Sequence, residues 1–341
     1  MYDRGMSVDD RFEDLVASLG GFYRTWFVHI GLETGLLRAL DEAGDGGLTV
    51  EELAARTGTD PRVVGEWAWG AAAHELVELD GDRLRRIPEL APVLLDSDRP
   101  EYLGGQFALA AVASLDYAGL ADFVRTGRPI GARPDRYRRA IERLTVQDVA
   151  VFFHEVLSAL PQLVADLRPG SRILDVHCGG GRWLIAMARR FPGTQLTGVE
   201  FEADSVERAR RNVAAADLAD RITIEHREVT QIEPSGSVDL AYFQYALHQL
   251  PDAPAALRSA WGALRPGGRL IALDWYLPSD PEAFRSRHGE LIAGVHLDEL
   301  YGGMGLVTED AAVAWFEAAG ILDPTVIDLP SGATAIVAGR T

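Results

Sequence analysis

The sequence predicts an α/β protein whose doubly wound, mostly parallel sheet follows an all-helical, winged-helix-like domain. From Ser171 to Trp275, short apolar segments alternate with amphipathic ones, the pattern of a parallel sheet covered by helices on both faces. Before residue 100, short helical segments lead into a hairpin, as in winged-helix modules. We expect a winged-helix-like domain over 1–100, a helical connector lining a substrate pocket over 101–165, and the sheet domain over 166–341.

Composition excludes several classes of protein. The 341 residues are 47% hydrophobic and carry a net charge of −18, so two packed cores are expected and nucleic acid is an unfavourable partner. A single cysteine, Cys178, can form neither an internal disulfide nor a four-cysteine zinc site. We find no signal peptide and no long uncharged apolar run, which predicts a cytoplasmic protein without a membrane segment.

Within the first hundred residues, three signals mark the elements. Thr49 and Glu52 form a capping box that opens a helix. Asp60 followed by Pro61 opens a second helix over 62–76. Asp80-Gly81 is expected to form the turn of a hairpin. The helix over 62–76 has Arg62 as its one cation, so it is predicted to be buried in packing or dimerisation, since a DNA-reading helix needs more polar and cationic side chains.

The next segments, up to about residue 167, are predicted to be helical, with a break near residues 127–131. In the last domain we expect strands at 172–176, 195–199, 222–225, 238–243 and 269–275, with helices at 183–191 and 204–216 and another ending near 264. Ligands of such sheets bind beyond the carboxyl ends of the strands.

A glycine-rich turn, Asp175 to Gly181, directly follows the first of these strands. Glycine allows the backbone to turn sharply and to approach a ligand closely. Leu184 stands where a dinucleotide fingerprint has its third glycine, and the chain has no lysine for a phosphate loop. The acidic residue that ends the strand favours a cationic ligand without phosphate.

This turn resembles the glycine loop of class I S-adenosylmethionine-dependent methyltransferases. Four further segments lie at matching intervals: 198–200, 228, 238–240 and 264–269. Together with the N-terminal domain, they are similar to the two-domain O-methyltransferases that dimerise through a winged-helix domain. The resemblance implies a Rossmann-like sheet, S-adenosyl-L-methionine as cofactor, a homodimer and a small-molecule substrate.

The same resemblance implies roles for individual residues at the cofactor. Asp175 would hold the methionine ammonium group, Glu200 the ribose hydroxyls and Phe201 the adenine. The remaining implied cofactor contacts are His177, Gly179, Gly181, Glu228, Val229 and Gln244. The chain departs from the pattern at three of its positions: His177 replaces the first glycine, Arg227 a small residue and Glu228 an aspartate.

For the chemistry, the segment around His248 resembles the part of the O-methyltransferases that carries their general base. Histidine can accept a hydroxyl proton at neutral pH, and Asp274 would orient it; packing at the start of a helix is the alternative role of this histidine. The second carboxylate expected near Gly302-Gly303 is absent, since Met304 follows. Aromatic and other side chains expected to line a substrate pocket are Phe152, Phe153, Trp275, His288, His296 and Met304. No metal is expected, because His288 and His296 are eight residues apart, on neighbouring helix faces, and lack the carboxylate or histidine partner at i, i+4 that a zinc site would show.

We therefore expect O-methylation of an aromatic or polycyclic, natural-product-like acceptor in secondary metabolism. Three alternatives remain open. The acceptor atom could be carbon or nitrogen. The fold could catalyse cyclisation, hydroxylation or decarboxylation instead of methyl transfer, which the histidine at position 177 motivates. The protein could also be a ligand-sensing winged-helix regulator.

Overall fold

The computed structural model describes residues 7–341. They form two compact units. The first runs up to Ala118 and includes Pro134–Gln147, and the second comprises Gly119–Arg133 and Asp148–Thr341. The connector predicted over 101–165 is therefore divided between the two units. Residues 1–6 of the predicted first domain lie outside the described part of the chain.

The first unit has a winged-helix arrangement built on a small antiparallel sheet of order β1-β3-β2. Both ends of the predicted capping box are present: Glu52 N donates to Thr49 Oγ1, and Thr49 N donates to Glu52 Oε2. The hairpin turn is Gly81-Asp82, one residue later than predicted, because Asp80 still pairs with Arg83 across the sheet. The elements are α2 (Leu36–Ala43), β1 (Leu48–Thr49), α3 (Val50–Thr57), α4 (Pro61–Ala73), β2 (Val77–Asp80), β3 (Arg83–Arg86), α5 (Ala91–Leu94) and α6 (Gly104–Ser114).

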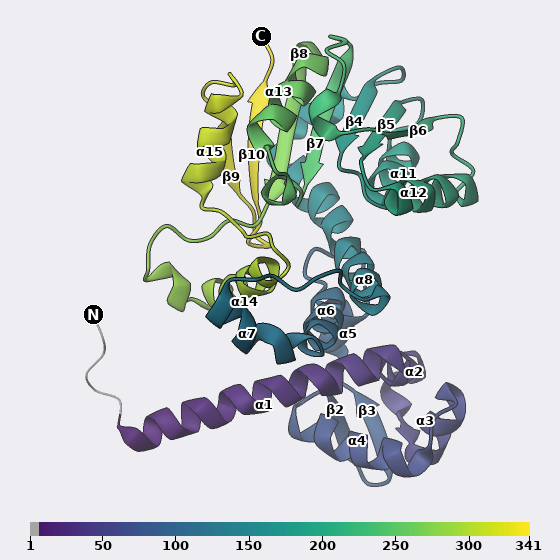
Figure 1. Cartoon of the computed structure of the whole chain (residues 1–341). Helices are drawn as coiled ribbons and strands as arrows, with labels where there is room; N and C mark the ends of the chain where they lie inside the picture. The colour runs from purple at the N-terminus through teal and green to yellow at the C-terminus, as the bar shows by residue number, and fades with distance from the viewer. Residues whose placement is uncertain (1–6) are drawn as a thin grey trace. The chain divides into compact units, whose positions relative to one another are not determined.

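The first unit opens with a long helix that the sequence analysis missed. Only short helices were expected before residue 100, but α1 (Val8–Glu33) spans 26 residues. Its Ser7 cap and Asp10 exchange hydrogen bonds in a second capping box. Near its C-terminal end it packs on α4, where Trp67 Nε1 donates to the carbonyl of Phe27. Figure 1 shows the N-terminal part of α1 extending beyond the rest of this unit.

The second unit contains a seven-stranded sheet of order β6-β5-β4-β7-β8-β10-β9. The five strands from β6 to β8 are parallel, and β10 is antiparallel to both of its neighbours. This confirms the predicted doubly wound sheet and adds two C-terminal strands. The strands are β4 (Arg172–Val176), β5 (Gln195–Glu200), β6 (Ile222–His226), β7 (Val238–Gln244), β8 (Leu264–Asp274), β9 (Thr325–Asp328) and β10 (Thr334–Gly339).

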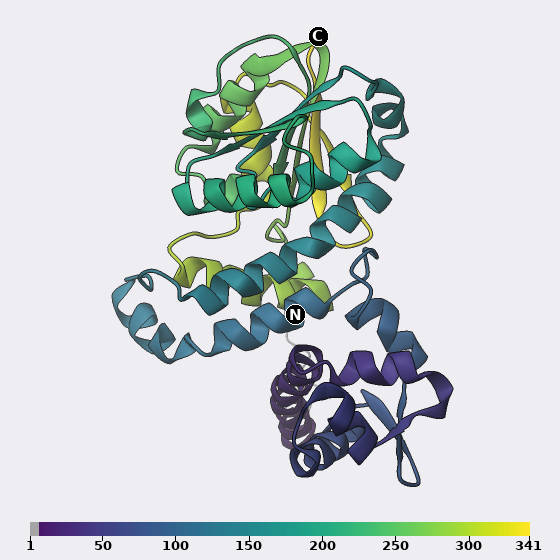
Figure 2. The same cartoon turned by 90° about the vertical axis from the view of Figure 1, so that its right-hand side faces the viewer.

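Helices cover both faces of this sheet (Figures 1 and 2). Because side chains alternate along a strand, neighbouring residues enter different cores: Ile173 packs on one face and Leu174 on the other. The flanking helices are α11 (Arg182–Arg190), α12 (Ala203–Ala215), α13 (Ala253–Ala263) and α15 (Glu309–Ala318). The two cores fix the strands, so the side chains at their carboxyl ends are held in register.

The helical stretch predicted over 135–167 is not continuous. It begins with α8 (Asp135–Val151), widens into a π-helical turn at Phe152–Val156, and restarts after Leu160. Pro161 explains the restart, because proline is favoured in the first turn of a helix. The other helices are α7 (Leu120–Thr126), α9 (Leu157–Ala159), α10 (Pro161–Asp166) and α14 (Arg287–Tyr301).

Among residues 7–341, no single helix is both long and apolar enough to cross a membrane, although Gly104–Ser114 and Tyr117–Thr126 meet those criteria as a bent pair.

Candidate active site

The glycine loop leaves the carboxyl end of β4 and enters α11. Gly179 and Gly181 have φ angles of 51° and 72°, in the left-handed region that glycine adopts without strain. The loop lies close to the next strand, because a Cβ on Gly198 would come within 2.6 Å of Cys178 Sγ. This close packing brings the loop backbone against the end of β5.

Asp175 is the last residue but one of β4 and is 2% exposed. It has no hydrogen-bond or ion-pair partner among the described residues. Burial raises the pKa of Asp175 to about 8, while the charges of His177 and Glu200 act in opposite directions. A buried acid without a partner gains most from a cation placed beside it.

Glu200 ends β5 and is fully buried. Its Oε1 accepts the N–H groups of Phe201 (2.8 Å) and Glu202 (3.0 Å), and its Oε2 accepts the N–H of Gly179 (2.9 Å). Burial by itself would raise the pKa of Glu200, but His177 and these backbone donors lower it. The carboxylate is therefore held in its ionised form at the junction of loop and strand.

His177 lies between this carboxylate and an aromatic ring. Its Nδ1 is 3.1 Å from Glu200 Oε2, and its ring stacks on Phe201 with centroids 5.1 Å apart and an angle of 12°. Burial alone would lower the pKa of His177, but Glu200, Glu202 and Gln249 raise it. Its φ of 64° is the left-handed conformation that the replaced glycine would adopt.

A second cluster lies at the ends of β7 and β8. His248 Nδ1 is 2.9 Å and 3.0 Å from the two carboxylate oxygens of Asp274, and Trp275 N donates to Asp274 Oδ1. The side chains of His248 and Asp274 are 5% and 1% exposed. Burial alone would lower the pKa of His248, but Asp274 and then Glu299 raise it.

Glu299 of α14 is a site residue that the sequence analysis missed. A second carboxylate was expected near Gly302-Gly303 and was judged absent. The structure places Glu299, three residues earlier, close enough to act electrostatically on His248. Burial raises the pKa of Glu299, and the positive charge of His248 opposes that rise. The sequence signal that could have identified Glu299 is its position near the C-terminal end of α14, just before Gly302.

Known proteins are similar to this chain in sequence and in fold. A family model described as a methyltransferase domain matches residues 173–268. The chain is 36% identical over 141 residues (39% of this chain, 52% of the relative) to 27-O-demethylrifamycin SV methyltransferase of Amycolatopsis mediterranei (strain S699). It is 32% identical over 280 residues (78% of this chain, 73% of the relative) to aclacinomycin 10-hydroxylase RdmB of Streptomyces purpurascens.

The chain belongs to the class I S-adenosylmethionine-dependent methyltransferase family. Its fold is also similar to that of CalO1, a methyltransferase in calicheamicin biosynthesis solved with S-adenosylhomocysteine (TM-score 0.70, 20% identity, 98% of this chain and 100% of the other). The alignment with the rifamycin relative spans about half of that protein's length.

The residues present fit S-adenosyl-L-methionine, the cofactor of this family. The partnerless carboxyl of Asp175 suits an ammonium group. On the neighbouring strand, Gln244 has a buried amide oxygen without a partner among residues 7–341, while its Nε2 donates to Asp148 at 3.3 Å. Burial raises the pKa of Asp148 to about 8, so this carboxyl is largely neutral at pH 7.

The remaining predicted cofactor residues differ in their surroundings. Val229 is buried beside the end of β6, and Phe201 is half-buried under His177. Glu228 is exposed at the start of a short 3-10 turn. Its contact with an adenine amino group therefore stays a prediction.

The structure places three of the residues predicted to line a substrate pocket, Phe152, Phe153 and Trp275, in or against one hydrophobic cluster. Phe152 is fully buried among Trp183, Tyr242 and Phe153. Its role in a pocket wall stays a prediction. Trp275 packs at the end of β8 with its Nε1 lacking a partner within the described chain.

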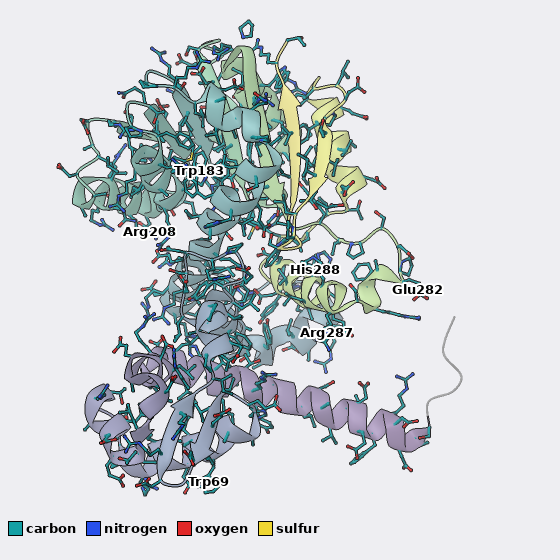
Figure 3. The ribbon with its side chains drawn as sticks, turned by 180° about the vertical axis from the view of Figure 1, so that it is seen from behind. Trp69, Trp183, Arg208, Glu282, Arg287 and His288 are labelled. Atoms are coloured by element: carbon teal, nitrogen blue, oxygen red, sulfur yellow. The ribbon has the colours of Figure 1, made fainter. Side chains whose placement is uncertain are left out.

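The α14 region holds the other predicted pocket residues. His288 is exposed at the start of the helix (Figure 3), and its ring lies over Gly332 in the β9–β10 turn. His296 is half-buried next to Gly305, and burial lowers its pKa. Met304 is 38% exposed.

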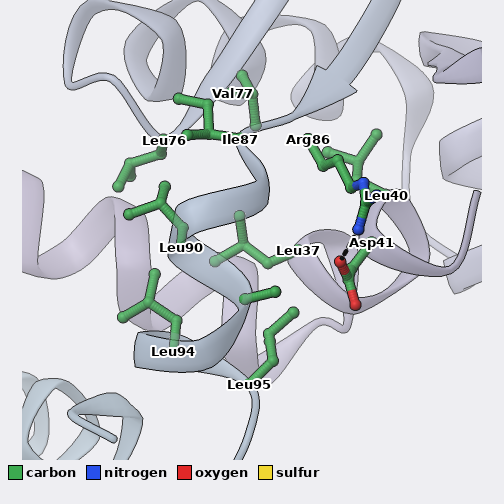
Figure 4. A pocket seen from close by; sticks show the side chains of 11 residues that line it. Leu37, Leu40, Asp41, Leu76, Val77, Arg86, Ile87, Leu90, Leu94 and Leu95 are labelled. Carbon is green, nitrogen blue, oxygen red and sulfur yellow. Dashed lines mark hydrogen bonds and ion pairs between the residues drawn. The ribbon is translucent and has the colours of Figure 1, made fainter. Parts of the chain in front are cut away.

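The first unit contains a separate small hollow (Figure 4). It is lined mainly by leucines of α2, α5 and the segments next to the hairpin, and its one charged pair is Arg86 with Asp41 at 2.9 Å. Because these charges neutralise each other, no reactive group faces the hollow. No group of three or more potential metal ligands occurs in residues 7–341.

Proposed function

We propose that this methyltransferase transfers the methyl group to a hydroxyl oxygen of an aromatic or polycyclic small molecule. The observation that supports the proposal is the buried pair of His248 and Asp274, with Glu299 beside it, at the strand ends next to the glycine loop. Transfer to oxygen needs removal of the hydroxyl proton, and a histidine held by a carboxylate is suited to that step.

The roles of the side chains follow from their contacts. Bound S-adenosylmethionine supplies an electrophilic methyl group. Asp274 accepts a hydrogen bond from Nδ1–H of His248, which leaves Nε2 as the nitrogen that takes the acceptor's proton. The two carboxylates then stabilise the imidazolium that forms. Asp175 holds the ammonium group and Glu200 the ribose, so the reacting carbon is positioned without further catalytic groups.

The test is formation of S-adenosylhomocysteine and a methylated product from a panel of aromatic and polycyclic hydroxyl compounds. His248→Asn should lower turnover about a hundredfold, while the affinity for S-adenosylhomocysteine stays the same. Asp274→Asn should have a similar effect, because it favours the wrong tautomer. Normal turnover in His248→Asn would reduce His248 to a packing residue, with carbon or nitrogen then the expected acceptor atom.

One observation favours a second candidate function. One relative that the chain matches over most of its length is named a 10-hydroxylase, and His177 alters the loop that holds the cofactor. The second candidate is therefore hydroxylation or a similar reaction without methyl transfer. A product that gains an oxygen atom from added O2, with a reductant present and no S-adenosylhomocysteine formed, would support it and would contradict our first proposal.

We also infer that the protein acts as a homodimer through the first unit. Helix α1 presents apolar side chains at spacings of three and four residues, the pattern of a helix seam. Phe12, Leu15 and Leu19 are each more than 60% exposed in the single chain. Such a stripe on a long helix is suited to a second copy of the same helix.

A further inference from the structure

We propose that His177 is a displaceable occupant of the nucleoside half of the cofactor site. Its imidazole contacts Glu200 and covers Phe201, the two residues assigned above to ribose and adenine, and it must move away when the nucleoside binds. This inference rests on the proposed cofactor site, and the experiments below separate a failure of one from a failure of the other.

The first argument is the capacity of the Glu200 carboxylate. A carboxylate has about four acceptor positions, and three backbone N–H groups already occupy three of them. The His177 imidazole lies over the remaining one, with Nδ1 at 3.1 Å from Oε2. A ribose hydroxyl therefore reaches Glu200 only by displacing a donor.

The second argument concerns which donor can leave. The three N–H groups belong to the glycine loop and to the chain just after β5, which the packing around Gly198 holds in place. The imidazole is on a rotatable side chain. Although Nδ1 is close to Oε2, the direction of its N–H does not satisfy hydrogen-bond geometry. The contact is thus an ion pair without the directional bond that would lock the ring.

The third argument is the stacking. The His177 ring is nearly parallel to Phe201, as a flat base packed on that ring would be. The same imidazole therefore contacts the carboxylate meant for the sugar and the aromatic face meant for the base. His177 therefore occupies the places of both the ribose and the base, so it competes with a nucleoside for the site.

The proposal predicts tighter binding when the ring is removed. By calorimetry on the full chain, His177→Ala and His177→Gly should bind S-adenosylhomocysteine about tenfold more tightly or better, since the ligand no longer competes with a charge-assisted contact. Both variants are needed, because glycine also relieves the strain of a positive φ and alanine does not. Asp217→Gly, which relieves the same strain at an exposed site, is the matched control and should bind like the unchanged protein.

The pH dependence of S-adenosylhomocysteine binding gives a second readout. The groups facing His177 are Glu200, Glu202, Asp175 and the amide of Gln249. As the pH rises through the raised pKa of His177, the imidazole becomes neutral and holds Glu200 less strongly, so the unchanged protein should bind more tightly. Asp175, whose pKa burial raises to about 8, also ionises as the pH rises and acts in the same direction. The His177 variants should keep only the part of the pH dependence that Asp175 causes.

The outcomes are distinct. Unchanged or weaker binding in both His177 variants would overturn the proposal. Unchanged binding would mean that His177 takes no part in binding, and weaker binding that it contacts the cofactor directly. Glu200→Gln should weaken binding in the unchanged protein and in His177→Ala alike. If Glu200→Gln has no effect, the cofactor site itself has been misassigned. A crystal structure with S-adenosylhomocysteine should show the His177 ring rotated away from Glu200, and a ring still stacked on Phe201 would contradict the proposal.

Discussion

At the scale of single residues, the site uses backbone conformations that most side chains avoid. Tyr245, directly after β7, has a φ of 48°, and its N–H donates to the carbonyl of Leu273 on the neighbouring strand. Such a conformation costs on the order of 1 kcal/mol or more and persists where the surrounding structure imposes it. Here it starts the turn that brings His248 back over the end of β8, next to Asp274.

The position of Glu299 near His248 leads to a prediction about the pH dependence of activity. His248 must be neutral to accept a proton, so activity should rise with pH through its pKa, which Asp274 and Glu299 raise. Glu299→Gln removes one negative charge and lowers the pKa of His248. The rising part of the pH–rate profile should therefore move to lower pH, by about one unit at most.

The matched control is Glu290→Gln, an exposed residue on the same helix, which should leave the profile in place. If the pH–rate profile of Glu299→Gln does not shift, the Glu299 carboxylate does not act on His248. A fall in rate at every pH without a shift would instead assign Glu299 to substrate contact.

Several site residues could be predicted from the sequence, because short motifs specify them. Asp175, Glu200 and the His248–Asp274 pair each end a strand or follow one closely, so correct strands place them correctly. Glu299 lies on a helix that no sequence motif marks. His248, the residue on which it acts, follows β7, well before this helix in the sequence. The ion pair of His177 with Glu200 also depends on two strand ends meeting, which spacing along the chain does not reveal.

At the scale of secondary-structure elements, α1 shows how a helix can escape sequence analysis. Gly20 and Gly21 interrupt its pattern, and its apolar stripe remains exposed in the single chain. A helix is normally recognised from an apolar stripe that packs against a core. Most of α1 packs against no core within its own unit. The strands of the sheet were predicted well because both of their faces are buried and their residues form continuous apolar runs.

The exposed stripe leads to a prediction about assembly. Leu15→Glu with Leu19→Glu should convert a dimer into a monomer, because charged side chains in the seam would be buried without partners. Analytical ultracentrifugation or light scattering measures the change in mass. Ala17→Glu, on the opposite side of α1, should leave the mass unchanged. A monomer already present in the unchanged protein would contradict the inferred homodimer.

At the scale of the whole molecule, charge distinguishes an enzyme from a regulator. The chain carries a net charge of −18, and the winged-helix arrangement of the first unit is found in DNA-binding proteins. A surface this acidic repels the phosphate backbone. We expect no shift of duplex DNA by the protein in gel electrophoresis at low salt, with or without S-adenosylmethionine. Tight, sequence-dependent binding would favour the ligand-sensing regulator.

The order of the sheet has a consequence for synthesis of the chain. β9 reaches the sheet only through β10, which pairs with β8 on its other side. The parallel strands up to β8 are complete long before Gly339 leaves the ribosome, so the edge of β8 stays open during translation. Open edges invite pairing with other nascent chains. A chaperone that shields this edge until β10 has been made should therefore improve the yield of folded protein.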